Sequence, residues 1–282
     1  MALGVHELNA IKWVHQRFGA LGKVATLGRQ GTGAYTSRSG QVYEAGYCES
    51  LLMNEFGATV VHSFDFSDYE GATHIFDLGR PLPIRSEYNL VIDGGTSEHV
   101  FNISQSLVNA SNLVAASGVV VHFLPANSFC GHGMYQVSPE VFFSLYSKSN
   151  GFDTDVFIAS YDGPNCFKYW YQVERPSKGE RVELSSKDSI GVIVIARKTH
   201  SKSLEDVFQS DYTQAWSGKR LNEAEGQSSI KKSIKKFLIF FGLFDFAKGI
   251  LSYYRACLKK YPYDFKSHQN LKRIDIKKLI KN

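Results

Sequence analysis

Hydrophobic and polar positions alternate between two patterns over the first 200 residues. Short apolar runs rich in β-branched and aromatic residues recur, and several are continuous, as in strands covered on both faces of a parallel sheet. These runs are KVATL (23–27), ATVVHSF (58–64), THIFDL (73–78), YNLVID (88–93), GVVVHFL (118–124), DVFIASY (155–161) and SIGVIVIAR (189–197). The pattern predicts seven strands in one sheet.

Helix-like stretches separate these runs. Residues 1–22 have the pattern of an N-terminal amphipathic helix, and the stretches 44–57 and 102–118 each end in glycine, as helices often do. A further stretch opens with Ser138 as an N-cap and Pro139 at the first helical position. Strands that alternate with helices predict an α/β fold with right-handed crossovers. We expect a Rossmann-like, seven-stranded, mostly parallel sheet with helices on both faces.

The chain changes character after this predicted domain, which spans 1–200. Residues 201–229 are polar and predict a linker, and 230–282 predict a basic amphipathic helical C-terminal extension. The extension holds 14 Lys and Arg against three acids, a net of +11, whereas 1–229 holds 18 against 24, a net of −6. Two interpretations of its apolar segment stay open. Residues 230–260 either lie on an anionic membrane surface or dock on the body of the protein or on a second copy.

Composition excludes several classes of protein. Hydrophobic residues make up 43% and charged residues 21% of the 282 residues, as is ordinary for a soluble globular protein. The four cysteines form no C-x-x-C pair, and the N-terminus has no signal-peptide pattern, so we expect a cytoplasmic protein, free or peripheral to the inner face of the membrane. No arrangement typical of a nucleic-acid-binding module is present. No metal site is expected either, because these residues lack ligand spacing: His62, His74, His122 and Cys130.

Polar and glycine-bearing turns follow the predicted strands. In an open α/β sheet, ligands bind at the carboxyl ends of the strands, near the point where the strand order reverses. Gly28 opens the turn after the first run, Asp65 follows the second, Asp77 ends the third and Asp93 ends the fourth. A carboxylate such as Asp65 is able to accept hydrogen bonds from both hydroxyls of a ribose, or it caps a turn. Position alone leaves these two roles open.

Two stretches carry a resemblance to a known family. DFSDYEGATHIFDLGRPLP (65–83) and the stretch 88–152, with "EH" after the fourth strand and "GHGMYQVSPE" after the fifth, resemble class I S-adenosylmethionine-dependent methyltransferases. The resemblance covers roughly 23–200 and is greatest to a bacterial group. It implies S-adenosylmethionine as the cofactor, with an acid at the ribose and another near the adenine. The residues implied to bind the cofactor or line its pocket are Gly28, Asp65, Asp77, Asp93 and Glu98.

The first loop departs from the family's pattern. That loop usually reads acid-x-Gly-x-Gly-x-Gly, and here only Gly28 falls in place. Thr26 replaces the acid, and Gln30 and Thr32 occupy the next two glycine positions. The change removes a charge pair with the methionine ammonium and puts a side chain where a glycine allows close backbone approach.

Histidines in two loops are candidates for chemistry. Glycines flank His132, so its loop is sharp, and an imidazole with a pKa near neutrality suits a general base. The alternative is that His132 and Tyr135 hold the following helix in place. Glu98 and His99 either take part in chemistry, or cap the helix after them and shape the pocket wall.

The sequence thus predicts a methyltransferase acting on a small molecule or a glycan, with a substrate class that comes from the resemblance alone. Its candidate catalytic residues are His132, Tyr135 and His99. The alternative is a non-catalytic methyltransferase-like binding or scaffold protein whose C-terminal helix docks on a membrane or partner. The altered first loop is the main support for this alternative.

Overall fold

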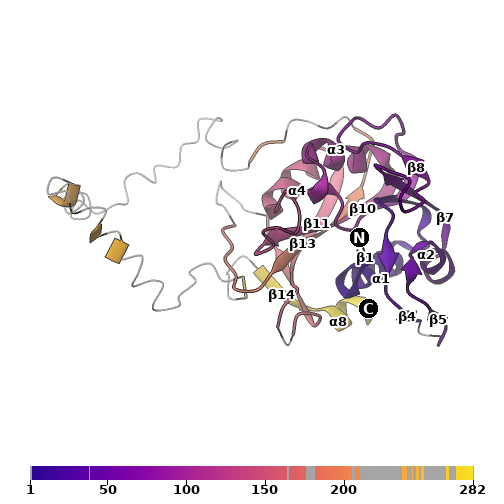
Figure 1. Ribbon diagram of the computed structural model, residues 1–282, viewed down its shortest axis with the longest axis horizontal. Helices are drawn as coiled ribbons and strands as arrows, with labels where there is room; N and C mark the ends of the chain where they lie inside the picture. The colour runs from indigo at the N-terminus through magenta and orange to yellow at the C-terminus, as the bar shows by residue number, and fades with distance from the viewer. Residues whose placement is uncertain are drawn as a thin grey trace.

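A central sheet of nine strands crosses the part of the chain that the structure describes (Figure 1). In sheet order, the strands are β14 (Leu271–Asp275), β12 (Tyr169–Val173), β11 (Phe152–Ser160), β13 (Ile190–Lys198), β10 (Val114–Asn127), β9 (Tyr88–Asp93), β2 (Gly22–Leu27), β7 (Ala58–Asp65) and β8 (His74–Ile75).

The sheet is mostly parallel. Pairing is parallel from β10 through β9, β2 and β7 to β8, and only β12 and β13 among these nine strands run against the others. In chain order, the first five strands follow the doubly wound arrangement 3-2-1-4-5. The order therefore reverses between β2 and β9, where Thr26 lies opposite Ile92. This reversal is the position at which an open α/β sheet binds its ligands.

The structure is a computed structural model. It describes residues 2–37, 39–163, 165–175 and 182–202, with 204, 207–209, 212, 237–239, 243, 246–247, 249–250, 265–266 and 271–281. Most of the predicted linker and most of the predicted helical extension lie outside these residues. None of the described helices is long and apolar enough to cross a membrane.

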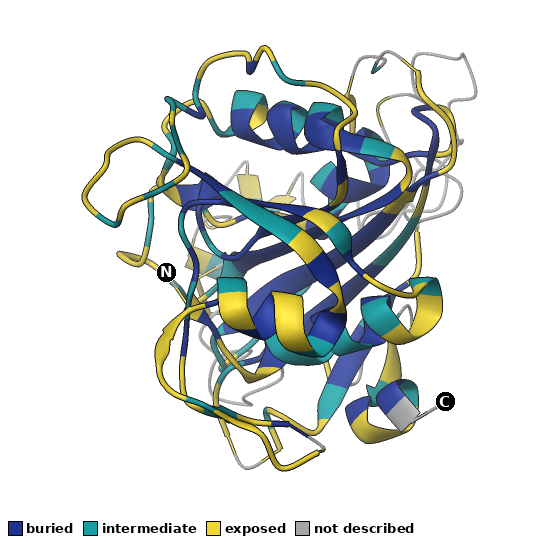
Figure 2. Cartoon of the chain, turned by 90° about the vertical axis from the view of Figure 1, so that its right-hand side faces the viewer, coloured by how far each residue is buried: buried dark blue, intermediate teal, exposed yellow. Residues whose placement is uncertain are grey.

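Helices cover both faces of the sheet, as the sequence predicts (Figure 2). One face packs against α1 (Val5–Phe18), α2 (Glu49–Phe56) and α8 (Ile276–Lys281), which bury Ile11, Leu51 and Ile280. The other packs against α3 (Ile103–Leu113) and α4 (Pro139–Leu145), which bury Leu107 and Phe142. The continuous apolar runs follow from this arrangement, because a strand with helices on both sides has no polar face.

Strand β13 shows how one run supplies two cores. Val192 and Val194 lie in the core under α3 and α4, whereas Ile193 and Ile195 lie in the core under α1 and α2. All four are 2% exposed or less. Side chains that alternate across the sheet with a period of two thus connect the two layers of helices.

Local signals place several helix ends. The hydroxyl of Ser138 accepts the backbone N–H of Glu140 at 3.3 Å, and Pro139 begins α4, which confirms the predicted N-cap. Gly57 ends α2 in the left-handed conformation, with φ +70°. The helix predicted over 102–118 is shorter, because β10 begins at Val114. That residue pairs with Tyr88 of β9, and sheet pairing there overrides the helical pattern.

The prediction of seven strands is corrected to nine. All seven predicted runs form strands of the sheet, and β12 and β14 extend it beyond β11. The expectation of a wholly helical C-terminal extension is wrong for Leu271–Asp275, which pair with β12. Edge strands often carry charged side chains, and β14 contains Lys272 and Arg273, so its apolar pattern is weak.

A small three-stranded sheet follows the turn after β2. It joins β1 (Ala2–Leu3), β3 (Gly31–Thr32) and β6 (Gly46–Tyr47). A two-stranded pair, β4 (Tyr35–Thr36) and β5 (Val42–Tyr43), lies in the same connection. Because β3 begins only a few residues after β2 ends, this sheet brings the N-terminal residues to the carboxyl edge of the central sheet.

Candidate functional site

The turn after β2 lies against the end of β7. Gly28 adopts φ +69°, a left-handed conformation that strains other residues, and its N–H donates to the carbonyl of Phe64 at 2.7 Å. The next backbone N–H, of Arg29, donates to Oδ2 of Asp65 at 3.2 Å. The structure therefore brings together two of the predicted cofactor residues, Gly28 and Asp65, at the ends of neighbouring parallel strands.

The carboxylate of Asp65 is oriented by backbone amides. It is half-buried, its Oδ1 accepts the N–H of Phe66 at 2.7 Å, and its Oδ2 accepts that of Arg29. Each carboxylate oxygen has two acceptor positions. Asp65 therefore keeps acceptor capacity for a hydroxyl-bearing ligand.

Arg29 ties three segments together beside this carboxylate. Its Nε donates to Oε1 of Glu49 at 2.8 Å, and one terminal nitrogen donates to the carbonyls of Glu70 and Gly71 at 2.6 and 3.0 Å. The guanidinium also lies 3.8 Å from the ring centroid of Tyr47. The sequence does not reveal this role of Arg29, because its partners come from α2, β6 and the loop after β7.

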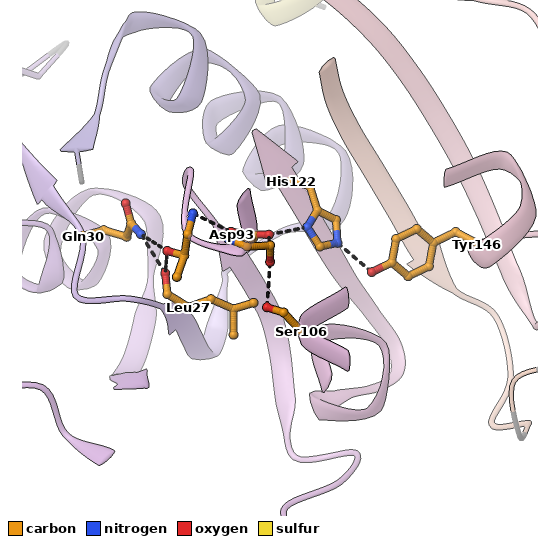
Figure 3. A network of polar contacts seen from close by, with 8 residues as sticks. Leu27, Gln30, Asp93, Ser106, His122 and Tyr146 are labelled. Atoms are coloured by element: carbon orange, nitrogen blue, oxygen red, sulfur yellow. Dashed lines mark hydrogen bonds and ion pairs between the residues drawn. The ribbon is translucent and has the colours of Figure 1, made fainter. Parts of the chain in front are cut away.

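Gln30 lies between the ends of β2 and β9 (Figure 3). Its side chain is fully buried and donates from Nε2 to the carbonyl of Leu27 at 2.7 Å and to the hydroxyl of Thr96 at 3.3 Å. A methyl group added at Gly94 would lie 2.5 Å from Oε1 of Gln30 and 3.1 Å from Cδ2 of Leu3. Oε1 itself has no hydrogen-bond partner among the described residues. The side chains of Gln30 and Leu3 therefore occupy the space against Gly94, where an open α/β sheet binds its ligands, and Gln30 leaves a buried acceptor unused.

Asp93 lies at the centre of a buried polar network (Figure 3). Its Oδ2 accepts the hydroxyl of Ser97 at 2.6 Å and lies 2.8 Å from Nδ1 of His122. Nε2 of His122 lies 2.6 Å from the hydroxyl of Tyr146, and Oδ1 of Asp93 accepts the N–H of Thr96 at 3.0 Å. Asp93 and His122 are wholly buried. The carboxylate that was predicted to line the pocket is thus engaged inside the protein.

Burial and hydrogen bonding act in opposite directions on this network. Burial alone would raise the pKa of Asp93, but the hydrogen bonds from His122 and Ser97 outweigh it and hold the pKa below its usual value. Burial raises the pKa of Tyr146 well above its usual value, so the phenol stays protonated. The network holds β9, β10 and the end of α4 in register.

Asp77 lies in a turn two residues beyond β8. Its Oδ1 accepts the N–H of Gly79 at 2.9 Å, and its Oδ2 lies 3.3 Å from Nε of Arg80. These contacts are those of a residue that caps a turn. The role near an adenine remains a prediction.

Glu98, His99 and His132 come together from two loops. Glu98 and His99 belong to η1 (Ser97–His99), directly after β9, and His132 belongs to the loop after β10. Oε1 of Glu98 lies 3.8 Å from Nε2 of His99 and 3.9 Å from Nε2 of His132. The carboxylate side chain is 1% exposed, whereas the imidazoles are 44% and 56% exposed. Sequence reasoning named all three residues but did not join them, although both loops follow neighbouring parallel strands.

The environment of this cluster shifts the pKa values of Glu98 and His99. Burial, with a smaller effect from the charge of Asp93, raises the pKa of Glu98 to about 8. Oε2 of Glu98 is buried without a hydrogen-bond partner among the described residues. Burial also lowers the pKa of His99, and the nearby His132 lowers it further. The cluster is therefore a buried acid beneath two accessible imidazoles.

Tyr135 holds the loop after β10 in place. Its hydroxyl donates to the carbonyl of Phe101 at 2.6 Å, and the N–H of Met134 donates to the carbonyl of Glu98 at 2.9 Å. These bonds join the loop after β10 to η1 and the residues that follow it. This contact joins Tyr135 to the segment after η1, whereas the sequence predicts that Tyr135 either holds the following helix, α4, or takes part in chemistry; both roles stay predictions.

Comparisons with known proteins give structural neighbours only. No protein-family model matches the chain, and no curated protein matches it. The protein YcgJ from a Bacillus species is 8% identical, with a TM-score of 0.41, over 69% of this chain and 100% of that one. The Burkholderia thailandensis 1,6-didemethyltoxoflavin-N1-methyltransferase, solved with S-adenosylhomocysteine, is 15% identical, with a TM-score of 0.40, over 70% and 78%. The N-methyltransferase NodS from Bradyrhizobium japonicum WM9 is 9% identical, with a TM-score of 0.40, over 68% and 93%.

At these identities and TM-scores the neighbours do not establish the chemistry of this chain. The fold rests instead on its own strand order, with the reversal between β2 and β9 and the reversed strand β13 between β10 and β11. This architecture is consistent with the Rossmann-like methyltransferase fold that the sequence resembles.

The site fits S-adenosylmethionine in one half and excludes it in the other. Asp65 has acceptor capacity for a ribose, and Oε1 of Gln30 is a buried acceptor without a partner among the described residues, although Gln30 stands at a glycine position of the family's loop and Thr26 at the position of its acid. However, the side chains of Gln30 and Leu3 occupy the space against Gly94. These residues fit the cofactor only in an arrangement in which both side chains have moved out.

Proposed function

We propose that the protein is an S-adenosylmethionine-dependent methyltransferase acting on a small molecule or a glycan, and that Gln30 and Leu3 close its cofactor crevice until they are displaced. The observation that carries the proposal is the position of Asp65. It lies at the end of β7, beside the left-handed turn at Gly28 and next to the reversal of strand order.

In the open arrangement, Asp65 would hold the ribose, and the amide of Gln30 would offer an acceptor in place of the missing acid. Asp77 near the adenine and Glu98 and Asp93 near the pocket remain predictions. The cofactor supplies a methyl group already activated on a sulfonium. The protein's tasks are to position the acceptor, exclude water and remove a proton from the acceptor.

Opening the crevice has a modest cost. The strand β1 pairs with β3 through only two residues, Ala2 and Leu3. Moving the buried Leu3 side chain into water costs about 1.5–3 kcal/mol, and a pairing of two residues opens more readily than a core strand. The unused Oε1 of Gln30 lowers the stability of the closed arrangement further.

The acceptor would approach from the side of Glu98, His99 and His132, because these residues follow β9 and β10 on the same edge of the sheet. The exposed imidazoles of His132 and His99 are the groups there that are able to take a proton from a hydroxyl or an amine. Tyr135 would position the loop that carries His132, since its hydroxyl is bound to Phe101.

A second candidate function is that of a non-catalytic binding or scaffold protein on the same fold. The contacts of Arg29 with Glu49, Glu70, Gly71 and Tyr47 favour it, because they lock the first loop in the closed arrangement. Docking on an anionic membrane or on a second copy through residues 230–260 remains part of this proposal.

Calorimetric titration with S-adenosylhomocysteine distinguishes the methyltransferase from the non-catalytic binding or scaffold protein. The wild-type protein should bind weakly, and Leu3→Ala should bind more tightly because it favours the open crevice. Asp65→Ala should weaken binding by about 1–3 kcal/mol, and Asp68→Ala, which removes an exposed carboxylate from the same loop, should leave it unchanged. If neither the wild type nor Leu3→Ala binds at high micromolar ligand while folded, the methyltransferase proposal is rejected in favour of the scaffold.

A further inference from the structure

The cluster of Glu98, His99 and His132 has the composition of a metal site. Each residue offers one ligand atom, and these three atoms lie within 4.8 Å of one another. We propose that the three side chains bind one divalent transition-metal ion of the zinc type. Two imidazoles and one carboxylate form a ligand set that proteins use for zinc and for other first-row transition metals.

The two distances from the carboxylate of Glu98 need only a small contraction. Ligand atoms bound at 2.0–2.1 Å to a tetrahedral zinc lie about 3.4 Å from each other. Oε1 of Glu98 now lies 3.8 and 3.9 Å from the two Nε2 atoms. The ring centroids of His99 and His132 lie 5.7 Å apart, with 56° between the ring planes. Because both imidazoles are about half exposed, rotation of their side chains is enough to close the site.

The buried carboxylate of Glu98 would be stabilised by a bound cation. It is 1% exposed, and its Oε2 is buried without a hydrogen-bond partner among the described residues. A carboxylate buried without a partner costs free energy, and a bound cation removes that cost. The two imidazoles lie beyond hydrogen-bond distance of its Oε1, so they do not satisfy the carboxylate in the present arrangement.

Glycines form the cradle that positions this carboxylate. A Cβ added at Gly133 would lie 2.8 Å from Cγ of Glu98, and one added at Gly95 would lie 3.1 Å from its Oε1. The main chain of these loops therefore packs directly against the glutamate. The sharp glycine-flanked loop that carries His132 thus has a second use, because it lets the loop approach Glu98.

The two loops are joined by hydrogen bonds that do not involve the proposed ligand atoms. The N–H of Met134 donates to the carbonyl of Glu98 at 2.9 Å, and within the loop after β10 the N–H of His132 donates to the carbonyl of Phe129 at 3.0 Å. Tyr135 binds the carbonyl of Phe101. The ligand-bearing segments are thus held near their bound positions, which reduces the ordering cost of metal binding.

The ligand set selects the kind of ion. Magnesium and calcium prefer sites made of oxygen atoms, whereas two imidazole nitrogens favour zinc and its neighbours. Three protein ligands leave a fourth position, and the exposed side of the imidazoles leaves it open to water or to an anionic group of a ligand. With the metal bound, His99 and His132 are ligands and are no longer free to act as bases. The site does not depend on cofactor binding or on methyl transfer.

Zinc titration of the full-length protein, after treatment with a chelator and removal of that chelator, tests the proposal. Calorimetry should show one Zn²⁺ bound per chain, with thermal unfolding shifted upward. His99→Ala, His132→Ala and the conservative Glu98→Gln should each weaken binding by at least the 10–100-fold that loss of a supporting group costs.

Two control variants distinguish this site from other zinc ligands. His200→Ala removes an exposed imidazole elsewhere, and Cys130→Ser removes an exposed thiol two residues before His132. Both should bind Zn²⁺ as the wild type does. The proposal is overturned if the wild type binds no zinc, if the three ligand variants bind like the wild type, or if Cys130→Ser alone abolishes binding. Zinc binding by a protein that does not bind S-adenosylhomocysteine would leave this site standing and reject only the proposed activity.

Discussion

Nδ1 of His122 lies 2.8 Å from a carboxylate oxygen of Asp93, and neither side chain is exposed to solvent. The two residues sit opposite each other on the paired strands β9 and β10. Their contact therefore couples the middle of the sheet to the turn that carries Thr96, Ser97 and Glu98. Loss of the contact should lower the stability of the protein and disturb the turn at the carboxyl edge of the sheet.

The variant Asp93→Asn should be less stable than the wild type by about 1–3 kcal/mol near neutral pH, because a charged hydrogen-bond partner is lost inside the protein. Folding lowers the pKa of Asp93, so its contribution is present above the unfolded-state value of about 3.9 and is lost as the pH falls toward the folded-state value. Urea midpoints of both proteins should therefore converge below about pH 4. A gap that stays constant across the acid range would contradict the proposed ionised state.

Arg29→Ala should destabilise the protein by about 1–3 kcal/mol, because it removes a half-buried ion pair and two hydrogen bonds to carbonyls. Arg80→Ala is the matched control. Its partner Asp77 is close, but the arginine side chain is 79% exposed, and such pairs contribute little. Thermal or urea unfolding of the two variants measures the difference, and equal losses would show that Arg29 does not lock the loop.

Gly133→Ala should destabilise the loop after β10, because the added Cβ would approach Cγ of Glu98 to 2.8 Å. Gly33→Ala is the control, since a Cβ there meets no atom within 4 Å among the described residues. We expect a loss of about 1–3 kcal/mol for the first and less than about 0.5 kcal/mol for the second. Unfolding by urea provides both values. A neutral Gly133→Ala would mean that the loop does not pack on Glu98 as described.

The cysteines should differ in reactivity. Cys48 is 1% exposed, and burial, with a smaller effect of Glu49, raises the pKa of its thiol to about 12. At about pH 8 only about one thiol in 10⁴ would then be the reactive thiolate. Iodoacetamide should therefore modify the exposed Cys130 in the native protein and reach Cys48 only after unfolding. Peptide mass spectrometry reads out both positions, and early labelling of Cys48 would contradict its burial.

Much of the fold follows from local patterns. The seven apolar runs are all strands because burial on both faces demands continuous apolar sequence. Ser138 marks the start of α4 because its hydroxyl accepts a backbone N–H, and Gly57 marks the end of α2 because it adopts the left-handed conformation. The strands β12 and β14 escaped prediction for physical reasons. Trp170 in β12 is buried by packing that no periodicity reveals, and β14 is an edge strand that carries charges.

The candidate site was less predictable than the fold. Strand ends bring Gly28 near Asp65, and topology alone predicts this. Gln30 and Leu3 both lie against Gly94, and Leu3 reaches this place through the pairing of β1 with β3. The burial of Asp93 depends on His122, a strand residue with no distinguishing local pattern. Such long-range partners leave no signal in the sequence near the residue they affect.

The late position of the edge strand β14 in the chain has a consequence for folding during synthesis. β12 is synthesised long before its neighbour β14, and its outer edge pairs with Leu271–Asp275 alone among the described strands. Until those residues leave the ribosome, that edge presents unpaired backbone groups to any other strand in reach. The nascent chain therefore exposes the edge of β12 to aggregation, and synthesis of Leu271–Asp275 ends that exposure.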